Sequence, residues 1–147
     1  MSRISATGDF TPHIDLDGAT ARHHWSYWLG WALSALIIVF FCVDGAIKLV
    51  PLDIVISTLE GLGYPAEHAR LIGIITIAGV VLYAIPRTSV LGAIVLTGLF
   101  GGAIATHLRV NSPLFSHTLF GFYMGVITWL GLYLREPKLH ALLPFRR

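Results

Sequence analysis

Four long apolar runs dominate this chain, and they hold nearly every long stretch that lacks charge. Each is 15 to 19 residues long. A helix rises about 1.5 Å per residue and the hydrocarbon core of a bilayer is about 30 Å thick, so each run spans the core or nearly does. The runs are Trp25–Val43, Leu71–Ile85, Val90–Thr106 and Thr118–Leu134. The sequence therefore predicts an all-α membrane protein, built as an up-down-up-down bundle of four transmembrane helices.

The composition supports a membrane protein and excludes several other classes. Hydrophobic residues make up 55 % of the 147 residues and charged residues 12 %, against about 25 % charged residues in soluble domains. The net charge of +2 is too small to favour nucleic acid as a partner. The single cysteine, Cys42, excludes an intrachain disulfide and a CxxC redox pair.

The runs and the segments between them define the expected organisation. We expect a polar cytoplasmic segment at 1–24, a transmembrane domain at 25–136 and a basic cytoplasmic tail at 137–147. The transmembrane helices are predicted at about 25–49, 67–86, 88–108 and 114–135.

A short amphipathic helix is predicted at about 52–60, between the first two runs. Pro51 can open a helix because its missing N–H costs nothing at the first position. Apolar residues recur at helical spacing beyond it, while Asp53 and Glu60 lie on the other side. This segment is too short and too polar to span, so we expect it to lie in the membrane interface.

The distribution of Lys and Arg predicts the orientation. Seven basic residues fall on the side shared by both termini and the central hairpin turn, and three fall on the other side. The positive-inside rule then places both termini in the cytoplasm. The seven are Arg3, Arg22, Arg87, Arg135, Lys138, Arg146 and Arg147, and the three are Lys48, Arg70 and Arg109.

Two glycine pairs suggest close helix packing. Gly98 and Gly102 are four residues apart in the third run, and Gly121 and Gly125 in the fourth. Small residues at this spacing let helix backbones approach closely in lipid. We expect these two faces to pack, either within the bundle or across a dimer.

Polar residues gather at the predicted outer end of the bundle, where a ligand site is most easily built. Charged side chains near membrane depth are costly and often mark function, although those near an interface can extend toward water. The candidate ligand-binding residues are Asp44, Lys48, Tyr64, His107 and Arg109. An intrahelical ion pair is the alternative explanation for Asp44 and Lys48, and interfacial hydrogen bonding is the alternative for His107.

The sequence assigns no catalytic residue. It contains no GxGxxG or Walker-type loop, and no GxSxG or HExxH motif. His107 and His117 could ligate a haem from adjacent helices, but without a CxxCH motif the sequence predicts no resident cofactor and no metal site. Any redox role would need electrons from a partner.

Several motifs resemble the DoxX-like family of small bacterial membrane proteins. They include Asp44-Gly45-Ala46-Ile47-Lys48-Leu49, Leu62-Gly63-Tyr64-Pro65 and Gly101-Gly102-Ala103-Ile104-Ala105-Thr106-His107-Leu108-Arg109. The resemblance covers about Trp28 to Pro144 and implies a four-helix protein of the bacterial inner membrane. Relatives include subunits of quinone-linked sulfur oxidation and proteins of membrane redox defence. Many members carry a Glu in helix two, where this chain reads Ile74-Ile75-Thr76-Ile77, which argues against catalysis by this chain.

Three functional hypotheses follow. The leading one is a small accessory subunit that binds a quinone or another lipid-like ligand near the outer leaflet, in one cleft around Lys48, His107 and Arg109. The second is a structural subunit that docks a partner membrane protein or a second copy of the chain. The third is a small transporter, which the end positions of all the acidic residues disfavour.

Overall fold

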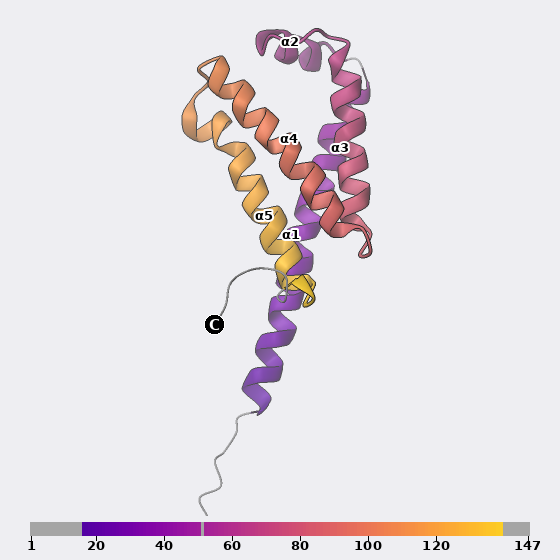
Figure 1. Cartoon of the computed structure of the whole chain (residues 1–147), viewed down its shortest axis with the longest axis vertical. Helices are drawn as coiled ribbons and strands as arrows, with labels where there is room; N and C mark the ends of the chain where they lie inside the picture. The colour runs from indigo at the N-terminus through magenta and orange to yellow at the C-terminus, as the bar shows by residue number, and fades with distance from the viewer. Residues whose placement is uncertain (1–15, 51, 140–147) are drawn as a thin grey trace, which may run out of the picture.

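The computed structural model describes residues 16–50 and 52–139, with side chains described from Trp25 onward (Figure 1). This part of the chain contains helices and no strand, so the prediction of an all-helical protein is confirmed for it. The helices are α1 (Leu16–Leu49), α2 (Asp53–Gly61), α3 (His68–Ala84), α4 (Ser89–Arg109), the π-helical turn η1 (Leu114–Thr118) and α5 (Phe120–Arg135).

Three helical segments are long and apolar enough to cross a membrane, judged by length and composition. They are Trp25–Leu49 within α1, Ser89–Arg109, which is α4, and Leu114–Arg135, which joins η1 to α5. Helix α3 is also apolar but has only 17 residues. At about 1.5 Å per residue it is slightly shorter than the hydrocarbon core is thick.

Two helix ends differ from those expected from sequence. Helix α1 begins at Leu16, nine residues before the predicted start at Trp25. No proline interrupts this stretch, and its alanines and Arg22 favour a helix. The last predicted helix, at 114–135, begins as a π-helical turn before α5. Most of the predicted N-terminal segment, residue 51 and residues 140–147 lie outside the described residues.

The four long helices form a ring of neighbours. Helix α1 packs against both α3 and α5, α4 packs against α3 and α5, and α2 contacts α3. The turn at 85–88 is short, so α3 and α4 form a helical hairpin (Figure 1). Helix α2 lies across the opposite end of α3 from this turn.

Glycines permit the closest approaches between these helices. On α1 and α3, a Cβ added to Gly73 would lie 3.0 Å from the carbonyl oxygen of Gly45. On α4, a Cβ added to Gly92 would lie 2.1 Å from the backbone nitrogen of Tyr83 on α3. No side chain fits at Gly92, because the obstacle is backbone. Small residues at such crossings are the usual means by which membrane helices pack.

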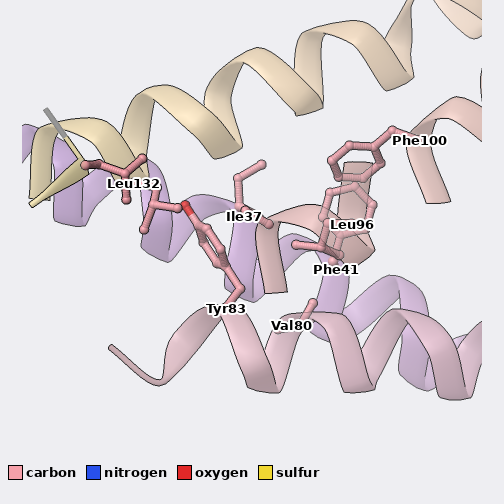
Figure 2. Close-up of a cluster of buried hydrophobic side chains, with 9 residues drawn as sticks. Ile37, Phe41, Val80, Tyr83, Leu96, Phe100 and Leu132 are labelled. Carbon is pink, nitrogen blue, oxygen red and sulfur yellow. The ribbon is translucent and has the colours of Figure 1, made fainter. Parts of the chain in front are cut away.

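A buried tyrosine near the end of α3 joins three helices. Tyr83 of α3 is fully buried among Ile37, Leu96 and Leu132 (Figure 2). Its hydroxyl donates a hydrogen bond to the carbonyl oxygen of Thr128 on α5 at 2.8 Å. A phenol has one hydrogen, so the 3.1 Å contact with Ser34 on α1 is donated by the serine hydroxyl.

A buried arginine extends this network toward the end of α5. Arg135 is 7 % exposed, and its Nη2 donates to the carbonyl oxygen of Tyr83 at 2.7 Å. Its guanidinium carbon lies 4.6 Å from the centre of the Tyr83 ring and 4.9 Å from that of Trp31. Cation–π contacts of this kind stabilise a cation removed from water. The basic residue at the end of α5 is therefore part of the core.

Replacing Gly92 with alanine tests the contact between α3 and α4. The new Cβ cannot be accommodated without moving the Tyr83 backbone, so we expect a loss of about 1–3 kcal/mol of stability and a lower melting temperature in detergent. Gly101→Ala on the same helix is the control, since an added Cβ there would meet nothing within 4 Å. Equal melting of the two variants would show that this contact does not hold the hairpin together.

Candidate functional site

The turn after α2 places Tyr64 at one end of the bundle. Gly63 has a φ of 78°, a left-handed conformation that glycine adopts without strain. The N–H of Tyr64 donates to the carbonyl oxygen of Leu59 at 2.9 Å, and that of Gly63 to Glu60 at 2.8 Å. This is the Schellman pattern of helix termination, and Tyr64 packs against the apolar cluster of Val55, Leu59 and Ala69. The LGYP sequence thus fixes where the tyrosine lies.

Tyr64 also reaches across to α4. Its hydroxyl lies 2.8 Å from the hydroxyl oxygen of Thr106. Thr106 donates its own hydrogen to the carbonyl oxygen of Gly102 at 2.8 Å, so Tyr64 is the donor of the bond between the two side chains. The connection between α2 and α3 is therefore tied to the last turns of α4.

Arg109 makes a second contact between α4 and the connection from α2 to α3. Its Nη2 donates to the carbonyl oxygen of Leu62 at 2.6 Å, and its guanidinium carbon lies 5.9 Å from the centre of the Tyr64 ring. Among the described residues, no carboxylate lies within ion-pair distance of Arg109. The side chain is exposed, and a guanidinium carries five N–H donors. Arg109 can therefore bind a further acceptor.

Asp44 and Lys48 form an intrahelical ion pair in the last turns of α1. Both side chains are partly buried. The Cβ of Lys48 would lie 3.1 Å from a Cβ added at Gly73, so this part of α1 faces α3. The pair satisfies both charges locally, as the alternative reading of the sequence expected.

Two histidines meet at the connection between α4 and α5. The rings of His107 and His117 have centroids 5.7 Å apart and planes inclined by 63°. The Nδ1 of His107 lies 2.9 Å from the hydroxyl oxygen of Ser112, and the Nδ1 of His117 lies 2.8 Å from that of Ser116. Each ring is thus oriented by a serine that is close to it in sequence.

The structure brings the five predicted ligand-binding residues into three groups. Tyr64 and Arg109 lie together, Asp44 pairs with Lys48, and His107 pairs with His117. In the described part of the chain, no hydrogen bond or ion pair links Lys48 to His107 or Arg109. A single cleft around Lys48, His107 and Arg109 stays a prediction.

The two predicted glycine pairs do not face each other within the chain. A Cβ added at Gly98 or Gly102 would meet nothing within 4 Å, so this face of α4 is open. A Cβ added at Gly121 would lie 2.9 Å from the carbonyl oxygen of Phe100, and one at Gly125 would lie 3.7 Å from the Phe100 ring. Helix α5 therefore contacts α4 through Phe100, which is two residues from both Gly98 and Gly102 and so lies on nearly the opposite side of α4. Packing across a dimer stays a prediction.

Sequence reasoning missed the partners of these groups. Thr106 looked like part of an apolar run, and Trp31 like a member of an interfacial aromatic belt. The available signal was a hydroxyl within an apolar run, at Tyr83 and Thr106, because such groups need a hydrogen-bond partner in lipid. The distant partners of these two hydroxyls lie 42 to 49 residues away in sequence and become visible only in the fold.

The described side chains at this end of the bundle include hydrogen-bond donors and cations. No group of three or more His, Cys, Asp and Glu side chains that could hold a metal ion occurs among them. The chemistry that Arg109 supplies is donation of hydrogen bonds to an acceptor, whereas the one hydrogen of the Tyr64 hydroxyl is already donated to Thr106.

Comparison with known proteins identifies the family. None of the curated proteins and none of the solved structures compared with the chain matches it. The profile described as the DoxX-like family matches residues 32–131, about two thirds of the chain. The match covers most of α1, all of α2, α3 and α4, and most of α5. The chain is an integral membrane protein of the DoxX-like family.

Proposed function

We propose that α1, α3, α4 and α5 all cross a bacterial inner membrane, up-down-up-down, with both termini in the cytoplasm. Helix α3 packs against two helices that are long enough to span, and a short span is accommodated by local thinning of the bilayer. The seven-to-three distribution of basic residues supports the orientation. Helix α2 then lies at the outer interface.

Cysteine labelling tests this topology. In a Cys42→Ala background, Glu60→Cys on α2 should react with a membrane-impermeant maleimide added to intact spheroplasts. Arg87→Cys, in the turn between α3 and α4, should react only after the membrane is opened. Both positions are exposed in the structure. Labelling of position 87 from outside, with protection at 60, would invert the orientation.

We further propose that the chain is an accessory subunit that binds a lipid-like ligand, such as a quinone, at the outer end of the bundle. The observation that supports this is Arg109, an exposed cation without an acidic partner among the described residues, held beside Tyr64 and an apolar helix surface. A quinone carbonyl or a lipid headgroup offers the acceptor that its free N–H groups can bind. Roles for Asp44, Lys48 and His107 in this site stay predictions.

Replacing Arg109 with glutamine tests the ligand proposal. Hydrogen bonds to charged groups contribute about 1.5–3 kcal/mol, so we expect at least about tenfold weaker binding of a ubiquinone analogue to the protein in nanodiscs. Arg70→Gln is the matched control, because Arg70 is also an exposed cation and lies in the first turn of α3. Melting without ligand shows how much of the change is structural. Equal affinities of the two variants would contradict the proposal.

The open glycine face of α4 favours a second candidate, a structural role through contact with another membrane protein or a second copy. Gly98, Gly101 and Gly102 leave a surface where another helix could approach closely. Self-association is the version we propose here. Self-association through this face does not require a bound ligand, so it can be tested independently of the ligand proposal.

Gly102→Leu tests this second candidate. The leucine should meet no atom of its own chain closely, so the melting temperature of the monomer should not fall, whereas a helix packed on this face would be pushed away. We expect loss of the oligomer by native mass spectrometry in detergent. Ala78→Leu, on the exposed side of α3, is the control. A parent protein that is monomeric, or an unchanged oligomer in Gly102→Leu, would exclude association through α4.

A further inference from the structure

The connection between α4 and α5 has an unusual local structure. Asn111 adopts a positive φ of 52°, and η1 is a π-helical turn in which the Leu119 N–H donates to the Leu114 carbonyl oxygen at 2.8 Å. Turns of this kind are rare and occur frequently at functional sites. Here the turn brings His117 back to His107 at the end of α4.

Both imidazoles leave the same nitrogen available. A serine hydroxyl lies within hydrogen-bond distance of each Nδ1, and neither Nε2 has a partner among the described residues. A serine hydroxyl can donate to Nδ1 or accept from Nδ1–H, and in the tautomer that donates to the serine the lone pair lies on Nε2 and is available to a metal ion. Metal-binding histidines are held in the same way, with the other ring nitrogen donating to a neighbouring oxygen.

The separation of the rings agrees with a shared ion. With metal–nitrogen distances of about 2.0–2.1 Å, two imidazoles on one ion have centroids about 5 Å apart at a tetrahedral angle and about 6.5 Å apart in a linear arrangement. The observed centroid distance of 5.7 Å lies between these values. The ring of His107 is half-buried and that of His117 is exposed, so an ion has access from solvent.

We propose that His107 and His117 form a binding site for a divalent transition-metal ion that prefers imidazole, such as Zn²⁺ or Cu²⁺. The two Nε2 atoms coordinate the ion, and Ser112 and Ser116 hold the rings. Since the described residues add no third ligand of this type, water completes the coordination. The site rests on the geometry of the α4–α5 connection and does not depend on the proposed quinone or lipid ligand.

Metal titration of the full chain tests the site. Calorimetry with Zn²⁺ should show one ion per chain that is absent from the His107→Gln/His117→Gln variant, which keeps the other five histidines. Each single glutamine substitution should weaken this binding by at least about tenfold, while His68→Gln should bind as the parent does. Glutamine retains a side-chain amide that can bond to the serines, so the fold should persist.

Copper provides an independent readout of the same site. The spectrum of bound Cu²⁺ by pulsed electron paramagnetic resonance should show two coordinated imidazoles in the parent and one in each single variant. Ser112→Ala should weaken Zn²⁺ binding by about tenfold or more, because it frees the His107 ring. Identical binding by the parent and the double variant, dependence on one histidine alone, or one ion per two chains would each overturn the proposal.

Discussion

The hydroxyl of Tyr83 is the group on which the arrangement of the bundle depends. Lipid gives membrane helices no hydrophobic reason to prefer one another, so packing and hydrogen bonds must select their positions. Tyr83 meets both needs: its hydroxyl joins α1 to α5, and its backbone lies against Gly92 of α4. Arg135 adds a buried cation that is held by the same residue. One position on α3 thereby contacts each of the other three long helices.

The sequence could predict the helices but not their rotations. The apolar runs whose helical length is near the thickness of the bilayer predict α4 and α5. Pro51, Gly63 and the polar face between them predict α2. Whether Gly102 or Phe100 of α4 faces α5 depends on a rotation of the helix by a fraction of a turn. Glycine spacing carries no information about that rotation, because Gly98 and Gly102 remain on one face whichever way it points.

In the candidate site, contacts between residues close in sequence could be predicted, and contacts between residues far apart in sequence could not. Asp44 and Lys48 are four residues apart on one helix, so their pairing could be predicted from spacing alone. The sequence predicts that Tyr64 and Arg109 lie at one end of the bundle, but it does not reveal that Leu62 and Thr106 are their partners. The approach of His117 to His107 depends on a π-helical turn, which periodic patterns do not reveal.

The hydrogen bond from Arg109 to the Leu62 carbonyl oxygen links the position of α2 to ligand binding at Arg109. An acceptor that used the same Nη2 hydrogen would compete with the Leu62 carbonyl oxygen, which lies directly after α2. By thermodynamic linkage, an occupant that used this hydrogen would weaken the contact by the same free energy by which the contact weakens its own binding. This competition concerns that one hydrogen only: an acceptor bound by the other N–H groups of the guanidinium leaves the contact between Arg109 and Leu62 in place.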